Sequence, residues 1–168
     1  MSIAESVANA SAYLTEHPDE ARYRDAAAHA RLESGLAVSV TGPGGESLRT
    51  DMPVGIGGAA SAPSPGWFLR AATASCVVAL VAIRAAATGI ALGDVDVTVD
   101  SESDDRGILG LDPSISAGAL STKIDVTIRA HGRTPMELDD LARWAIDHCP
   151  VSDTIRRSVP LEINVRVS

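Results

Sequence analysis

The stretch SPGWFLRAATASCVVALVAIRAAATG, residues 64–89, predicts the central element of the fold. Ser64 is a favourable helix N-cap, and Pro65 fits the first helical position, where a backbone N–H has no partner within the helix. The predicted helix runs from about residue 65 to 88, stops at Gly89 and is apolar nearly all round. Because a helix without a polar face must be covered by other elements, this one is expected in the core.

Alternation of apolar and polar residues predicts strands on both sides of this helix. They are expected at residues 36–40, 48–52, 95–100, 124–129 and 161–167. The first two flank Gly42-Pro43-Gly44-Gly45, a strong turn signal, so they should form a β-hairpin.

Three further helices are predicted. Residues 2–16 have apolar side chains at helical spacing, and Thr134-Pro135-Met136-Glu137 is a capping box that begins a second helix. Pro150 ends that helix, and a short one follows at about 151–157. Residues 101–120 should form a long irregular connection. This order predicts an α+β domain with antiparallel sheet.

Composition restricts the class of protein. The 168 residues fit one domain, and a net charge of −8 disfavours nucleic acid and anionic lipid as partners. Residues 1–14 have no basic n-region or continuous apolar run, so they do not resemble a signal peptide. The apolar run Ala71–Ile83, between Arg70 and Arg84, is too short to span a bilayer. A soluble, cytoplasmic protein is therefore expected.

Cys76 and Cys149 are the candidates for chemistry. Taken singly, a cysteine in an apolar helix is most often a packing residue, and Cys76 needs a cation or hydrogen-bond donors to become a reactive thiolate. Cys149 precedes Pro150, which places it near the cap of the short helix, where free amides favour an anion. Two core thiols, a redox pair and one structural disulfide all remain open.

Other kinds of site have little support. The four histidines lack metal-ligand spacing, and no Gly-x-Ser-x-Gly motif indicates a serine hydrolase. Aromatic residues make up only 3% of the chain, too few for a base-stacking surface.

The segments around both cysteines resemble the motifs of the OsmC/Ohr family, the osmotically inducible and organic hydroperoxide resistance proteins. The first segment comprises Gly57-Gly58, Ala62-Pro63-Ser64-Pro65, Phe68-Leu69, Ala71-Ala72 and Ala74-Ser75-Cys76, and the second is Cys149-Pro150-Val151-Ser152. The resemblance covers residues 28–167 of a single domain, 1–168, and leaves the helix at 2–16 as an extension outside the family core.

The resemblance implies an intertwined homodimer, with antiparallel sheets wrapped around two long buried helices and active sites at the interface. It implies that Cys76 attacks an organic hydroperoxide and becomes a sulfenic acid, which Cys149 converts to a disulfide. A small dithiol or a lipoyl-type reductant would restore the pair, and no metal or organic cofactor is required.

One departure from the family pattern concerns the thiolate. The family carries a glutamate just after the helix start, which holds an arginine against the reactive sulfur; this chain has Gly66 there. Arg31 is the nearest match for the arginine, with Arg49 and Arg70 as substitutes. Val151 also stands where an aromatic residue is common. These departures favour a second hypothesis, a non-catalytic dimer that binds a hydrophobic small molecule or acts as a slow redox sensor.

Overall fold

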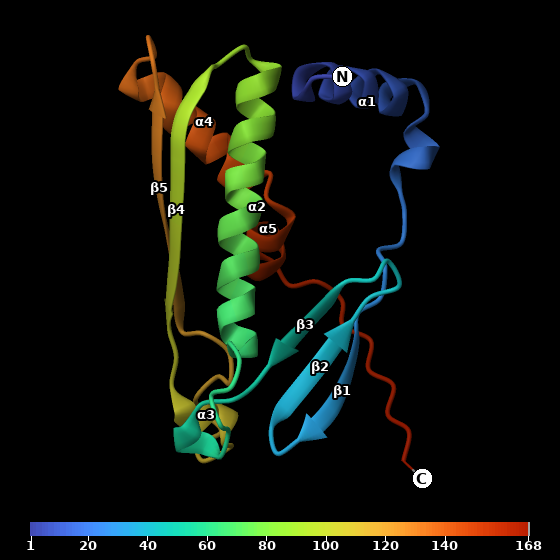
Figure 1. Ribbon diagram of the computed structural model, residues 1–168, viewed down its shortest axis with the longest axis vertical. Coiled ribbons are helices and arrows are strands. Elements are labelled where there is room, and N and C mark those ends of the chain that lie inside the picture. The colour runs from blue at the N-terminus through green and yellow to red at the C-terminus, as the bar shows by residue number, and fades with distance from the viewer. Residues whose placement is uncertain (168) are drawn as a thin grey trace.

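The computed structural model of the protein describes residues 1–167. Figure 1 shows a long central helix, a two-stranded and a three-stranded sheet, and peripheral helices. In chain order the elements are α1 (Ile3–Glu16), the 3-10 helix η1 (Pro18–Ala21), β1 (His29–Ser34), β2 (Ala37–Thr41), β3 (Ser47–Thr50), the 3-10 helix η2 (Val54–Ile56), α2 (Pro65–Ala87), β4 (Leu92–Glu102), α3 (Asp105–Ile108), β5 (Ser121–Ala130), α4 (Pro135–Asp147) and α5 (Pro150–Arg156).

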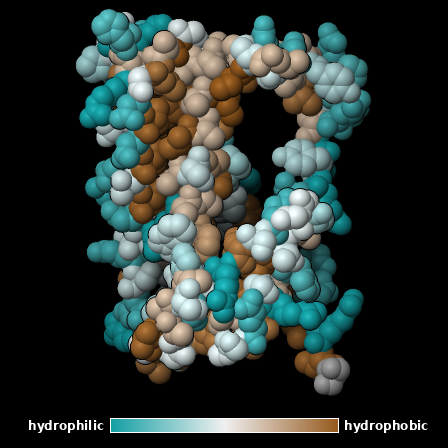
Figure 2. Space-filling model, viewed as in Figure 1, coloured by the Kyte–Doolittle hydropathy of each residue, from teal (hydrophilic) through white to brown (hydrophobic). Residues whose placement is uncertain are grey.

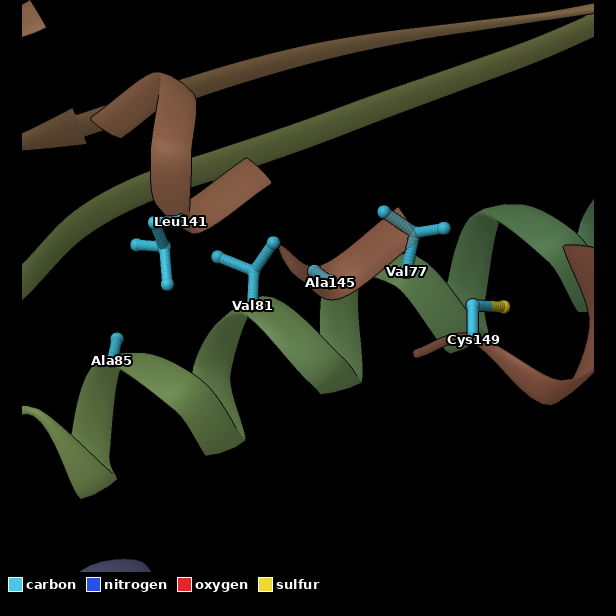
Figure 3. Close-up of a cluster of buried hydrophobic side chains, with 6 residues drawn as sticks. All are labelled: Val77, Val81, Ala85, Leu141, Ala145 and Cys149. Carbon is cyan, nitrogen blue, oxygen red and sulfur yellow. The ribbon is translucent and has the colours of Figure 1, made fainter. Parts of the chain in front are cut away.

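The helix α2 is the centre of the core, as predicted. One of its faces is buried through Thr73, Val77, Val81 and Ala85, which repeat at the four-residue spacing of a helix face. This face packs against β4, α4 and α5. The expectation that this apolar stretch is too short to span a bilayer is wrong by length and composition, because the helix has 23 residues and is apolar enough to do so. In the structure one face of α2 joins a core cluster with residues of α4 (Figure 3).

Both sheets are antiparallel. The order β1-β2-β3 includes the predicted hairpin, in which Val40 pairs with Leu48. The long strands β4 and β5 pair along their whole length, with Val97 opposite Val126, and their half-buried side chains contact the core cluster. In Figure 1 the β1–β3 sheet lies to one side of α2, while β4 and β5 run beside the helix.

Local signals in the sequence set the helix ends. The side chain of Ser64 accepts a hydrogen bond from the amide of Trp67 and caps α2. Thr134 and Glu137 form the predicted capping box at the start of α4. The connection predicted to be irregular between β4 and β5 contains one short helix, α3.

The last predicted strand is wrong for the single chain. Residues 158–167 form no strand, and the side chains of Leu161, Ile163 and Val165 are 81%, 73% and 79% exposed. A strand needs a neighbouring backbone edge to satisfy its amides and carbonyls, and no sheet within residues 1–167 pairs with this segment.

The outward face of α2 is also uncovered. Ala72, Ser75 and Ala79 are exposed along it, although the apolar sequence predicts that the helix is surrounded. Figure 2 shows brown and tan side chains along this region of the surface, beside the opening between α1 and the β1–β3 sheet. The chain therefore leaves apolar surface of its central helix without intramolecular cover.

Candidate thiol active site

The fold brings the two predicted cysteines together. Cys76 lies in the middle of α2 and is partly exposed, whereas Cys149 lies between α4 and α5 and is 0% exposed. Both are free thiols, and Cys76 packs against the core cluster that includes Cys149. Figure 3 shows Cys149 beside α2, at the end of the core cluster near Val77. Two residues far apart in the sequence thus form one thiol pair.

The junction between α4 and α5 positions Cys149. Pro150 occupies the first position of α5, which makes Cys149 its N-cap. The Cys149 sulfur accepts a hydrogen bond from the amide of Ser152 at 3.5 Å. The Ser152 hydroxyl donates to the carbonyl of Ile146 at 2.7 Å and to that of Cys149 at 3.2 Å. The prediction that Cys149 lies near a helix cap is confirmed.

The two thiols differ in acidity. Burial raises the pKa of Cys76, the hydrogen bond and charge of Cys149 raise it further, and the amide of Val151 opposes them. Burial also acts to raise the pKa of Cys149. It is outweighed there by the Ser152 amide, the Cys76 thiol, the Ser152 hydroxyl and the Val151 amide, so the pKa of Cys149 is lowered. Hydrogen bonds to the charged form stabilise a thiolate at Cys149.

The three candidate arginines lie elsewhere. Arg31 is exposed on β1 opposite Ser39. Arg49 on β3 forms an ion pair with Glu33, 2.8 Å between Nε and Oε2. Arg70 donates from Nη1 to the Ser101 hydroxyl at 3.1 Å. Within residues 1–167, no arginine contributes to the pKa of either thiol. The role of Arg31 beside the thiolate stays a prediction.

Gly66 leaves open space at the start of α2. A Cβ placed there would lie 3.8 Å from Nη1 of Arg70 and 4.0 Å from Oγ of Ser64, both ordinary contact distances. A side chain at this position is therefore sterically permitted. The missing glutamate does not reflect a backbone that requires glycine.

A mostly apolar pocket of about 420 Å³ lies beside the first turns of α2. Its walls include Ile56, Leu69 and Val99, with Arg70 and Ser101 as polar groups. Neither cysteine lines it. Thr73 lines both this pocket and a second one of about 360 Å³, which reaches Ser152 next to Cys149. The two pockets thus adjoin at Thr73, three residues before Cys76 on α2.

Reasoning from sequence missed the part played by Ser152. This serine is 4% exposed, and its amide and hydroxyl together hold the end of α4 and the cap of α5. Its spacing from Cys149 contains the signal, because an N-cap side chain accepts from the amide two or three residues later. A cysteine is simply not among the usual N-cap residues.

Comparison with known proteins gives the family. The profile of the OsmC-like proteins matches residues 58–164, a range that includes both cysteines. No match was found among curated proteins.

Solved structures share the fold at low sequence identity. An OsmC-like protein from Mycoplasma pneumoniae is 17% identical, with a TM-score of 0.68 over 88% of this chain and 98% of that chain. An organic hydroperoxide resistance protein from Legionella pneumophila is 24% identical, with a TM-score of 0.58 over 80% and 91%. The protein OhrB of Bacillus subtilis, also an organic hydroperoxide resistance protein, is 18% identical, with a TM-score of 0.53 over 80% and 93%. These similarities establish the antiparallel α+β fold.

Proposed function

The chain belongs to the OsmC-like protein family, and from this premise we propose that it is a thiol peroxidase that reduces organic hydroperoxides with Cys76 and Cys149. The observation that supports the proposal most directly is the contact between the two thiols, one partly exposed and one buried. Hydroperoxide resistance proteins among the structural neighbours are consistent with this assignment.

Exposure supports a division of roles between the thiols. Cys76 is accessible to a substrate, so it would attack the terminal oxygen of the hydroperoxide, release an alcohol and become a sulfenic acid. Cys149 has no exposed surface, but it touches Cys76 and would displace water to form the disulfide. A small dithiol or lipoyl-type reductant would then restore both thiols.

The substrate class follows from the pockets. An apolar pocket of about 420 Å³ beside α2 favours an organic hydroperoxide over hydrogen peroxide, because apolar surface is released from water when an organic group binds. We also propose that the activity belongs to the cytoplasm, as protection against oxidative stress, because a reducing compartment would keep both thiols available between turnovers.

The functional unit would be a homodimer formed by the whole domain. The uncovered face of α2 and the unpaired apolar alternation at residues 161–167 both require a second surface. A second copy would provide backbone edges for the C-terminal segment, and it could also bring Arg31 of either copy to the thiol pair.

The test is time-resolved intact-mass spectrometry of reduced protein after one equivalent of cumene hydroperoxide, with hydrogen peroxide in parallel. We expect rapid loss of two hydrogens, faster with the organic peroxide and absent in Cys76→Ser. The variant Cys149→Ser should instead accumulate the sulfenic acid. Absence of a disulfide within minutes would reject the peroxidase.

One observation favours a second function. The pocket is lined without either cysteine, and Gly66 adds no side chain to its wall, so a hydrophobic small molecule could be bound without redox chemistry. This alternative predicts slow, non-selective oxidation together with saturable binding of an apolar fluorescent probe, and that binding should persist in Cys76→Ser.

A further inference from the structure

The pocket of about 420 Å³ beside the first turns of α2 has a cation in its wall. The walls are mostly apolar and come from η2, from the start of α2 and from the connection between β4 and β5. The side chain of Arg70 lies among them, partly buried, and its Nη1 donates to the Ser101 hydroxyl at 3.1 Å. A charge in apolar surroundings is costly unless an opposite charge or several hydrogen bonds compensate it.

The described chain supplies no opposite charge to this guanidinium. Within residues 1–167 the ion pairs do not include Arg70, and its side chain donates to a neutral hydroxyl instead. A guanidinium has five N–H donors in a planar fork. Donors beyond the one that binds Ser101 can therefore receive the two oxygens of a carboxylate, the group that arginine binds with the best geometry.

Acidic side chains in the same wall leave Arg70 without a partner. Asp104 is paired with Arg106, at 2.5 Å between Oδ2 and Nη2. Asp105 is exposed, so water and salt screen its charge. The N-terminus of α2 adds a partial positive charge at the same end of the pocket. Because the whole chain has a net charge of −8, attraction of an anion has to come from these local groups.

The pocket and the uncovered face of α2 lie on different sides of the helix. Gly66, Arg70 and Thr73 line the pocket and repeat at helical spacing, so they share one face. The exposed residues Ala72 and Ser75 lie on another face. A second copy of the chain can therefore cover the exposed face without filling the pocket.

We propose that this pocket binds an organic carboxylate, with the carboxylate on the Arg70 guanidinium beside Ser101 and an apolar chain against Ile56, Leu69 and Val99. A volume of about 420 Å³ is typical of small-molecule sites. One guanidinium balances one negative charge, so a carboxylate suits it better than a phosphate monoester, which carries about two. The inference goes beyond the proposed function, because neither cysteine lines the pocket and the bound molecule need not react.

The test is isothermal titration calorimetry of the reduced protein with decanoate, and with 1-decanol and decyl phosphate in parallel. We expect decanoate to bind one site per chain at least about tenfold more tightly than decanol, because it adds hydrogen bonds between charged groups. Added salt should weaken decanoate binding. Decanol that binds as tightly as decanoate, or decyl phosphate that binds more tightly, overturns the proposal.

Variants of two arginines on α2 locate the carboxylate. Arg70→Gln should weaken decanoate binding by about tenfold and leave decanol binding unchanged. Arg70→Lys should recover part of the lost affinity, since lysine keeps the charge without the fork. Arg84→Gln is the matched control, because Arg84 lies on the same helix but over the Trp144 ring. Decanoate affinity that does not respond to Arg70→Gln places the ligand elsewhere and overturns the proposal.

A carboxylate built into the chain should compete with the ligand. A Cβ at position 66 would lie 3.8 Å from Nη1 of Arg70, so the side chain of Gly66→Glu can reach the guanidinium. We expect Gly66→Glu to bind decanoate at least about fivefold more weakly than Gly66→Gln, which has the same size without the charge. Equal losses in the two variants would mean that bulk excludes the ligand and that charge does not matter, which contradicts the proposal.

A measurement on the unmodified chain covers the case in which Arg70→Gln does not fold. The ¹⁵N–¹H signal of the Arg70 guanidinium should shift in NMR spectra on addition of decanoate and stay in place on addition of decanol. A signal that does not move at saturating decanoate overturns the proposal.

These measurements use no hydroperoxide, so their outcomes are separate from those of the peroxidase test. Rapid disulfide formation in a protein that does not bind decanoate would reject this inference and leave the proposed function intact. Decanoate binding through Arg70 in a protein that forms no disulfide would do the opposite.

Discussion

Asp51 is a buried carboxylate that accepts four hydrogen bonds. Its oxygens accept from the amides of Met52, Ala59 and Ser61, at 2.7, 3.2 and 3.0 Å, and from the Ser61 hydroxyl at 2.7 Å. The Ser61 amide and hydroxyl are the main reason why the pKa of Asp51 falls to about 2. Since only 2% of the residue is exposed, the charge at Asp51 fixes the loop between β3 and α2.

A pH dependence follows from Asp51. Its pKa in the folded chain is about 2, below the ordinary 3.8. The stabilisation is therefore complete above about pH 4 and is lost as the pH falls towards about 2. We expect Asp51→Asn to unfold at lower urea concentration than the parent at neutral pH, with the difference shrinking across that acidic window. The exposed Asp96→Asn on β4 is the control; an equally large effect there would contradict the assignment.

Restoring the family glutamate tests whether an arginine can be held against the reactive sulfur in this chain. Gly66→Glu has room, and the carboxylate would lie in the first turn of α2, four residues before Arg70. We expect the variant to gain about 0.3–1 kcal/mol in stability from the helix dipole and the ion pair. Because Arg70 binds Ser101 rather than a thiol, the rate of disulfide formation should stay within about twofold.

The control for Gly66→Glu is Gly66→Gln, which has the same shape without the charge. Thermal unfolding and the mass-spectrometric assay are the two measurements. A rate increase of about tenfold in Gly66→Glu alone would mean that a cation reaches Cys76 after all, since a tenfold effect corresponds to about one pKa unit of thiolate stabilisation.

The loop before α2 depends on one close backbone contact. A Cβ at Gly58 would lie 1.8 Å from the carbonyl oxygen of Met52, so the backbone would have to shift, whereas a Cβ at Gly55 meets nothing within 4 Å. We expect Gly58→Ala to destabilise the protein by about 1–3 kcal/mol, as overpacking does. Gly55→Ala should change the urea midpoint little. Equal effects of the two substitutions would refute this account of the loop.

The sequence predicts those elements whose signals are local. The caps at Ser64 and Thr134 identify the starts of α2 and α4, because a cap needs only the residues of its own first turn. The prediction of a C-terminal strand was wrong because a strand depends on a partner that is distant in the sequence. Alternation in residues 161–167 indicates a strand with one apolar face, but its partner edge is not encoded within the segment itself.

The candidate site could be predicted only in part. Motifs around Cys76 and Cys149 identified both residues, but the acidity of each depends on amides and burial that are fixed by packing between α2 and α5. The buried contacts of Ser152 likewise depend on the bend after Asp147. The strand β1, which carries Arg31, is exposed in the single chain. The distance from Arg31 to the thiols in an assembly therefore depends on how a second copy packs against this sheet.

At the scale of the whole molecule, exposed apolar surface is the main feature. The C-terminal segment exposes alternate apolar side chains, and in an extended strand the intervening Glu162 and Asn164 would face the other way. Stable monomers rarely leave such surface in water. A second copy that pairs with this segment would bury its apolar side and leave the side of Glu162 and Asn164 exposed to solvent.

This arrangement predicts that a charge added on the apolar side of the segment weakens the dimer, whereas a charge added on the polar side does not. Ile163→Asp should weaken the dimer and shift sedimentation at micromolar concentration towards the monomer, by about tenfold or more in dissociation constant for each buried charge. Asn164→Asp, next to it in the sequence and on the opposite side, is the matched control and should sediment as the parent does. If both variants remain dimeric at every concentration, the segment does not lie in the interface.

The N-cap role of Cys149 ties the stability of a helix to an oxidation state. A disulfide sulfur is a weak acceptor whose place is set by the new S–S bond, so oxidation would weaken the hydrogen bond that the Cys149 sulfur accepts from the Ser152 amide. The first turn of α5 would then open more often, and its amides would exchange with solvent faster in the oxidised protein than in the reduced one. Local unfolding of this kind would expose the buried sulfur, which the reductant must reach to complete the cycle.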